Sequence, residues 1–166
     1  RVRCVSGAGV HRRCVGKMKE KFYLEAAAEY AKRLGGYCRL TVTELPEERL
    51  PDRPTQAQIQ AALEREGAAI LAKLPKGGKV VAMCIEGKTM DSPQLAQRLS
   101  SWMVEGASDL TFLVGGSFGM SQTVKDKAHL RLSMSPMTFP HHLARVMLLE
   151  QIYRAFKIQE GSGYHK

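Results

Sequence analysis

Apolar and polar residues follow two patterns along this chain, one typical of strands and the other of helices. Residues 79–85 and 110–114 are nearly continuous apolar runs, as expected of strands covered on both faces. Residues 37–45 alternate with a period of two and are rich in threonine, valine and tyrosine, which also favours a strand. Together the patterns predict five strands, at residues 10–15, 37–45, 79–85, 110–114 and 130–134.

Helical patterns fill the segments between these strands. Phe22, Ala26, Tyr30 and Leu34 recur at helical spacing, and Gly35-Gly36 ends that helix. Side chains that can cap a helix stand at the starts of the next three. The predicted helices are residues 19–34, 55–74, 92–106, a short helix capped by Ser121, and 141–158.

Strands that alternate with helices predict an α/β fold, with a mainly parallel sheet flanked by helices. We expect one domain over residues 10–166, preceded by an N-terminal extension at residues 1–9. Ligands of such sheets bind beyond the carboxyl ends of the strands. The loops after Ile85, Val114 and Met134 are therefore the predicted ligand-binding region.

The composition is that of a globular protein with a basic surface. Of the 166 residues, 44% are hydrophobic and 25% charged, and no apolar run approaches the roughly 18 residues of a membrane-spanning helix. The 25 lysines and arginines outnumber the 16 acidic residues, and the excess lies in residues 1–39 and 139–166. Because a basic surface attracts phosphates, the charge favours nucleic acid as a partner. We expect no membrane partner, since no apolar run is long enough to span a bilayer.

The cysteines and histidines predict no metal site. The four cysteines lie far apart without a C-x-x-C pair, which favours reduced thiols in a cytoplasmic protein. His141 and His142 are adjacent, so on a helix their side chains diverge by about 100° and cannot both face one ion. We expect these histidines to face solvent or phosphate.

The glycine-rich segment 115–119 allows an alternative function. Gly115, Ser117 and Gly119 fit the G-x-S-x-G pattern of the α/β-hydrolase nucleophile, with a histidine such as His141 or His165 as the base. The chain is short for that fold, and few acidic residues follow the segment. The same glycines are equally typical of a tight turn, which lets a ligand approach the backbone closely.

The last predicted helix and the tail after it carry further candidate chemistry. Arg145 and Arg154 lie on a largely apolar helix, where they can face a phosphate or an anionic reaction centre, or form salt bridges. The tail ends with Tyr164, His165 and Lys166. A tyrosine can stack on a base, a histidine can move a proton and a lysine can bind phosphate, as an RNA-acting site requires.

Three stretches of the chain resemble one protein family. Near the start they are Val15-Gly16-Lys17, Lys19-Glu20-Lys21, Ala28-Glu29-Tyr30 and Lys32-Arg33-Leu34. In the middle they are Gly87-Lys88, Ser92, Leu95-Ala96 and residues 112–117 with Gly119. The most specific stretch is residues 132–141, continued by residues 145–146, 150–157 and 164–166. Over residues 10–166 the chain therefore resembles the RlmH family of the SPOUT superfamily.

The resemblance implies an enzyme with a particular substrate. Members of that family transfer a methyl group from S-adenosylmethionine to N3 of a pseudouridine in large-subunit ribosomal RNA, at the subunit interface of the ribosome. The resemblance also implies a C-terminal trefoil knot, which is rare among folds. It further implies a homodimer with an active site shared between protomers. Because a small protein has little surface with which to recognise an RNA fold alone, we expect the assembled ribosome to be the substrate.

The resemblance also implies site residues. By motif match, the cofactor pocket contains Met83, Gly115, Met134, Ser135, Pro136, Met137, Thr138 and Phe139. Methyl transfer is an in-line displacement, so holding donor and acceptor in line supplies most of the catalysis. Our hypothesis assigns Arg154 to stabilising the anion of the attacking nitrogen and His165 to the role of base or proton relay. Tyr164 and Lys166 would bind the RNA, with His141 as a further candidate.

Two features leave alternatives open. The start departs from the family, because residues 1–9 precede the first strand and His11, Arg12 and Arg13 occupy strand positions. Either that strand is distorted or the start is misassigned. The function also has rivals: a SPOUT methyltransferase acting on another RNA, or a ribosome-associated RNA-binding protein without catalysis.

Overall fold

The computed structural model describes residues 9–72 and 74–166. The strands are β1 (Gly9–Val15), β2 (Arg39–Leu45), β3 (Lys79–Thr89), β4 (Asp109–Val114) and β5 (Leu130–Ser133). The helices are α1 (Lys21–Leu34), α2 (Gln56–Leu71), α3 (Ser92–Val104), α4 (Gln122–Lys127) and α5 (His141–Glu160). Within these described ranges, no helix has the length and apolar character needed to cross a membrane.

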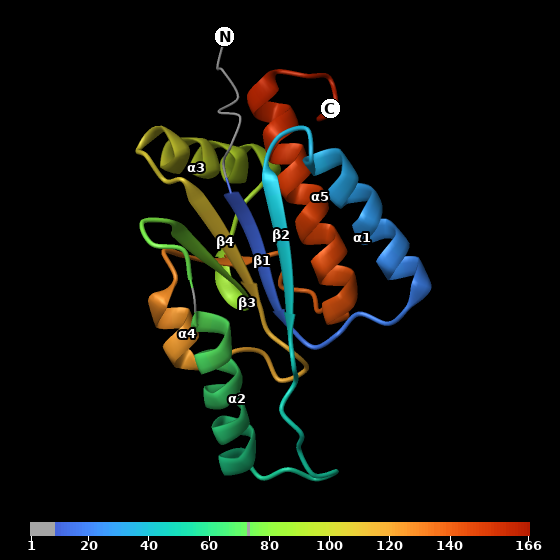
Figure 1. Cartoon of the computed structure of the whole chain (residues 1–166), viewed down its shortest axis with the longest axis vertical. Helices are drawn as coiled ribbons and strands as arrows, with labels where there is room; N and C mark the ends of the chain where they lie inside the picture. Colours follow the sequence, from blue (N-terminus) through green and yellow to red (C-terminus); the bar gives the residue numbers. More distant parts are fainter. Residues whose placement is uncertain (1–8, 73) are drawn as a thin grey trace.

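The strands form one sheet in the order β2-β1-β4-β3-β5, and every neighbouring pair is parallel. Helices cover both faces: α1, α3 and α5 pack on one side, and α2 and α4 on the other (Figure 1). The predicted α/β architecture with a parallel sheet is confirmed. The trefoil knot stays a prediction.

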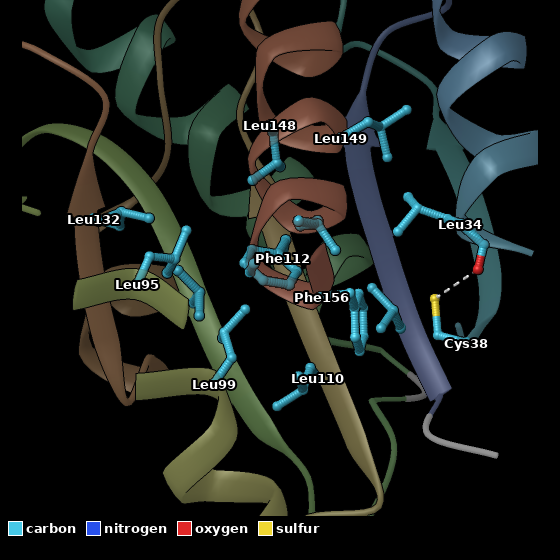
Figure 2. Packing of buried hydrophobic residues seen from close by; sticks show 14 of the residues in the cluster. Leu34, Cys38, Leu95, Leu99, Leu110, Phe112, Leu132, Leu148, Leu149 and Phe156 are labelled. Atoms are coloured by element: carbon cyan, nitrogen blue, oxygen red, sulfur yellow. Dashed lines mark hydrogen bonds between the residues drawn. The ribbon is translucent and has the colours of Figure 1, made fainter. Parts of the chain in front are cut away.

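Each face of the sheet has its own apolar core because successive side chains of a strand point to opposite faces. In β4, Leu110 and Phe112 pack among residues of α1, α3 and α5, where Phe156 also lies (Figure 2). Leu113 of β4 packs on the other face, with Ile70 of α2. Two-sided burial accounts for the continuous apolar runs in the central strands.

The first strand, β1, is regular and lies inside the sheet, so the expectation that this strand is distorted is wrong. It pairs in parallel with β2 on one side and with β4 on the other. Arg12 is only 3% exposed, and its guanidinium donates to the backbone carbonyl of Arg145 at 3.3 Å. Arg13 donates to a carbonyl of α2, and His11 pairs with Asp109. The strand tolerates these residues because long arginine side chains reach backbone acceptors beyond the apolar core.

A bulge interrupts β3, which continues past its predicted end. Leu132 of β5 lies opposite both Met83 and Lys88 of β3, so residues 84–87 leave the ladder. Gly87 completes this excursion, since a Cβ there would lie 2.8 Å from the backbone of β5.

Apart from the end of β3, the predicted boundaries agree with the structure to within three residues. The predicted N-terminal extension lies outside the described residues except for Gly9, which is the first residue of β1. Both ends of α5 are close to the prediction, and its last turn closes on Gly161 in the left-handed conformation, with φ of 77°.

Candidate functional site

The carboxyl ends of β3, β4 and β5 surround a cavity of about 610 Å³, which we call the central cavity. In a parallel sheet these ends meet at one edge, so the segments that follow them face one another. The lining consists of residues 83–86, 114–120, 125, 132–135, 137–141 and 144. The three loops singled out from the sequence thus contribute to a single cavity.

The wall contributed by β4 is a turn of nearly bare backbone. Gly116 and Gly119 form an isolated antiparallel bridge, and Gly119 has a φ of 86°, which favours glycine. A Cβ on Gly115 would lie 2.3 Å from the carbonyl oxygen of Gly119, so the turn itself requires glycine there. The backbone N–H of Ser117 donates to the carboxylate of Glu47 at 3.3 Å. The turn therefore presents main chain to the cavity.

Two serines shape the segment between β5 and α5. The hydroxyl of Ser133 donates to the carbonyl of Ser135 at 3.1 Å, and the hydroxyl of Ser135 accepts from the N–H of Met137 at 3.0 Å. Such side-chain bonds fold a short segment into a defined turn. Met137 is 72% exposed and stands at the rim of the cavity, whereas Phe139 is half-buried. The segment combines an ordered backbone with apolar side chains.

An ion pair closes the opposite side of the central cavity. Lys125 of α4 contacts the carboxylate of Glu86 in the β3 bulge, and its hydrogen bond lowers the pKa of Glu86. Beside it, Ile85 is 58% exposed. The pair joins the bulge to α4, so two elements that line the cavity are tied together.

The end of α5 and the tail form a second group of side chains, the C-terminal cluster: Glu150, Arg154, Tyr164 and His165. Arg154 donates to the two carboxylate oxygens of Glu150 at 2.8 and 3.3 Å, which raises the pKa of Arg154. Its guanidinium carbon lies 4.7 Å from the centre of the Tyr164 ring, whose hydroxyl donates to Glu150 at 3.0 Å. Arg154 also donates to Nδ1 of His165 at 3.2 Å, which leaves the proton of the neutral imidazole on Nε2.

The C-terminal cluster and the central cavity lie on different sides of the end of β5. Glu150 and His165 line a separate cavity of about 620 Å³. The linings of the two cavities share residues 132–134. Within one chain, Arg154 and His165 are therefore not part of the wall of the central cavity.

Comparison with known proteins decides the family. A family model described as "Predicted SPOUT methyltransferase" matches residues 10–165. The chain belongs to the SPOUT methyltransferase family. Two curated relatives, from Streptococcus suis and Leuconostoc mesenteroides, are each 46% identical over 152 residues, which is 92% of this chain and 96% of theirs. Both relatives are named ribosomal RNA large subunit methyltransferase H.

A solved structure shares the fold of this SPOUT chain at low sequence identity. It is a probable methylase family protein from Haemophilus influenzae, with a TM-score of 0.52 and 12% identity. The match covers 95% of this chain and 70% of that protein. At this identity the likeness concerns the fold alone.

The structure brings together most of the residues that sequence analysis assigns to the cofactor pocket. All of them except Pro136 line the central cavity, and Pro136 is exposed beside it. His141 also lines this cavity, and burial, followed by the nearby charges of His142 and Arg145, lowers its pKa. Lys166 is exposed at the end of the tail. Among the described residues, no group of three histidine, cysteine or acidic side chains is arranged to bind a metal ion.

Of the two roles considered for Arg145, facing an anionic ligand or forming a salt bridge, the structure supports the salt bridge. Its side chain is fully buried and donates to the carbonyls of Val15 and Gly16 and to Glu44. The guanidinium therefore connects α5 to the carboxyl ends of β1 and β2. In the SPOUT fold of this chain, Arg145 is a structural residue.

The hydrolase alternative finds no support in the geometry. Ser117 and His141 line the same cavity. Across the described part of the chain, however, the hydroxyl of Ser117 has no histidine as a hydrogen-bond partner. The glycines of the G-x-S-x-G pattern are required by the backbone geometry, as predicted for a tight turn.

Three contributors to the central cavity and its support could not be predicted from the sequence. Residues 84–86 line the cavity because of the bulge, for which the sequence carries no local signal. Lys125 reaches it from α4. Glu47 supports the glycine turn from the loop after β2. A carboxylate in a proline-rich loop gives no hint of a partner 70 residues away.

Proposed function

We propose that this chain is an S-adenosylmethionine-dependent methyltransferase that methylates N3 of a pseudouridine in large-subunit ribosomal RNA on the assembled ribosome. The supporting observation is the central cavity, where bare glycine backbone and apolar side chains meet at the carboxyl ends of three parallel strands. The names of the two relatives support the choice of ribosomal RNA. Ribosomes as substrate imply action in the cytoplasm.

The central cavity fits the proposed cofactor in size and chemistry. Its volume of about 610 Å³ is within the range of small-molecule sites. Met83, Met134 and Phe139 offer apolar surface to an adenosine ring, while the N–H and carbonyl groups of the glycine turn offer hydrogen bonds to its polar edges. Ser135, Met137 and Thr138 complete the side next to α5. Pro136, beside the cavity, fixes the backbone of that segment.

S-adenosylmethionine, when bound, supplies an activated methyl group. The chain's own residues have to orient the acceptor base, accept the proton from N3 and stabilise the resulting anion. Arg154 is assigned to the anion, since its guanidinium is charged at any physiological pH. His165 accepts the proton at Nδ1 once Arg154 turns from that nitrogen towards the base. Tyr164 and Lys166 bind the adjacent RNA by stacking and by charge.

The proposed site requires two protomers. In one chain, the end of β5 separates the central cavity from the C-terminal cluster. In a homodimer, the tail of one protomer can enter the central cavity of its partner and complete the site. The C-terminal trefoil knot that the family resemblance implies would fix the backbone of the cavity before the cofactor binds.

Methyl-labelled S-adenosylmethionine tests the proposal. The protein is incubated with ribosomes that lack the modification and, in parallel, with RNA extracted from them, and the label is located by nucleoside analysis. Label on N3 of one pseudouridine, in ribosomes only, is the expected result. Label elsewhere in the RNA would move the function to a methyltransferase with another target. Cofactor binding without any label would contradict the proposal.

Variants of the C-terminal cluster test the residue roles. R154A and H165A should each lower kcat by about 100-fold, with cofactor binding unchanged. R65A is the matched control, because Arg65 forms an exposed ion pair with Glu48 and lines neither cavity. Near-normal turnover in both R154A and H165A would show that other groups stabilise the anion and accept the proton.

A further inference from the structure

A third cavity also borders the central one, at the carboxyl ends of the two remaining strands, β1 and β2. It has a volume of about 720 Å³, and we call it the lysine cleft. Its lining consists of Gly16, Lys17, Lys19, Glu20, Glu44, Leu45, Pro46, Glu47, His141 and His142. His141 lines both this cleft and the central cavity. The two cavities are therefore neighbours across one side chain at the start of α5.

The acidic side chains of the lysine cleft are already engaged within the protein. Glu44 accepts from the N–H of Met18 at 2.8 Å and from buried Arg145. Glu47 accepts from the N–H of Ser117. Glu20 is 3.0 Å from Nδ1 of His142, a contact that lowers the pKa of Glu20. In the described part of the chain, each of the three carboxylates therefore has a hydrogen-bond partner other than Lys17 or Lys19.

Two lysines of the lysine cleft are free. Lys17 and Lys19 are exposed, and within residues 9–72 and 74–166 neither has a hydrogen-bond or ion-pair partner. Between them, Met18 is 3% exposed, and its N–H is bonded to Glu44. The loop that carries both lysines is thus anchored to the core. Two positive charges are presented at fixed backbone positions, which lowers the entropy lost when an anion binds.

We infer that Lys17 and Lys19 bind the phosphate backbone of the RNA substrate next to the target nucleotide, with the lysine cleft as the path of the RNA strand. The inference rests on the proposed function and adds to it a region distant in sequence from the tail. Phosphates are the ligand because two unpartnered lysines attract anions without base selectivity.

The remaining walls of the lysine cleft suit a nucleotide strand. Leu45 and Pro46 give an apolar surface on one side, and the imidazole of His142 gives a flat one on the other. His141, at the boundary, has a lowered pKa, so it stays neutral at pH 7 and can meet a base without adding charge. A strand whose phosphates contact the lysines would place a neighbouring base at the entrance of the central cavity.

The double variant K17A/K19A tests the inference. K76A/K127A is the matched control: it removes the same charge from two exposed lysines at the opposite edge of the sheet, in the turn before β3 and at the end of α4. Two measurements are made on the full chain. One is the affinity for ribosomal RNA over a range of salt concentrations, and the other is methyl transfer to ribosomes that lack the modification.

The expected results separate the two lysine pairs. K17A/K19A should lower the slope of log affinity against log salt by roughly 1.4 to 1.8, the value for two lost phosphate contacts. It should raise KM for the ribosome about tenfold, with kcat and cofactor affinity unchanged. K76A/K127A should leave KM and the salt slope close to those of the wild type.

Each outcome decides between the inference and the proposed function. If the two double variants have equal KM and salt slope and the wild type is active, Lys17 and Lys19 do not bind the RNA. The proposed methyltransferase function would then be unaffected. A wild type that binds RNA through Lys17 and Lys19 but transfers no methyl group would overturn the proposed function alone. A wild type that neither binds RNA nor methylates it would overturn both.

Discussion

Arg145 is the residue on which three elements of this fold depend. Its guanidinium is fully buried and donates to the carbonyls that end β1 and to Glu44 at the end of β2. These carbonyl groups have no further strand to pair with at that edge, and buried acceptors without donors are costly. A long cation from α5 satisfies them, and the sheet gains a defined end beside the lysine cleft.

Replacing Arg145 tests this structural role. R145M preserves much of the side-chain volume but leaves the two carbonyls without a donor and Glu44 without its cationic partner, so the free energy of unfolding should fall by about 3–5 kcal/mol. R65M is the control, because the exposed ion pair of Arg65 with Glu48 should contribute less than about 1 kcal/mol. Urea denaturation measures both values. A loss in R145M as small as that in R65M would contradict the role.

Glu66 gives a pH prediction with a defined sign. Burial, followed by the charges of Glu47 and Glu48, raises the pKa of Glu66 above its ordinary 4.5. The folded chain then binds a proton that the unfolded chain has released, so stability falls as the pH rises from 4.5 through the folded-state value. E66Q keeps the acceptor for the N–H of Glu48 and removes this dependence.

Unfolding free energies at pH 4.5 to 8 check the prediction for Glu66. The stability of E66Q relative to the wild type should increase with pH and then level off. E64Q, at an exposed position of the same helix, is the control. A difference between E66Q and the wild type that does not change with pH would show that the buried carboxylate does not change its protonation on folding.

The glycine turn between β4 and α4 is the element most directly tied to the site. Its conformation depends on Gly115, where a Cβ would lie 2.3 Å from the Gly119 carbonyl and 2.8 Å from Met120. The glycine that looked, from its sequence, like a point of ligand approach is first a requirement of the backbone itself. A substitution at Gly115 would therefore alter both the conformation of the turn and the access of a ligand to its backbone.

G115A should open this turn. Forcing a methyl group into that contact should cost about 1–3 kcal/mol of stability and weaken S-adenosylmethionine binding at least tenfold, as measured by calorimetry. G36A is the control, since a Cβ on Gly36 would have its nearest neighbour at 3.8 Å. Unchanged cofactor affinity in G115A would separate the turn from the binding site.

At the scale of elements, the sequence was sufficient to predict a helix or strand where its hydrophobic periodicity matched the burial seen in the fold. Residues 110–114 read as a buried strand because both faces of β4 are covered. The sequence was insufficient where a side chain depends on a partner far along the chain. Arg12 and Arg13 are unexpected in an interior strand, because their carbonyl partners lie on α5 and α2. The bulge at residues 84–87 depends on pairing with β5, which no local pattern records.

The candidate site divides in the same way. The motif match gathered the residues that line the central cavity, since they follow neighbouring strands of a parallel sheet. It could not reveal that Arg154 and His165 lie beyond the end of β5 in the same chain. A motif match identifies positions along the chain, but which cavity each side chain lines depends on how the elements pack.

For the whole molecule, the separation of the two groups predicts complementation between inactive chains. G115A damages the central cavity but keeps the C-terminal cluster, whereas R154A/H165A keeps the cavity but damages the cluster. In a dimer with shared sites, a heterodimer of these variants has one intact site of two, so it should recover about half of the wild-type activity per dimer.

Differently tagged chains, co-expressed and purified as the heterodimer, provide the measurement. Each variant alone, purified as the same kind of dimer, gives the baseline. A heterodimer no more active than these would mean that each tail serves the cavity of its own chain. A chain that stays monomeric would equally contradict the shared site.

The central place of β1 has a consequence for the time that folding takes. Its residues pair with β4 from Asp109 onward and are covered by α5, which begins at His141. The search for such distant partners costs loop-closure entropy before any contact stabilises it, and parallel sheets of this kind fold slowly. Until both arrive, β1 exposes an apolar edge, and Arg12 lacks its acceptor on α5. We therefore expect this strand to be the part of a newly made chain that most needs protection by a chaperone.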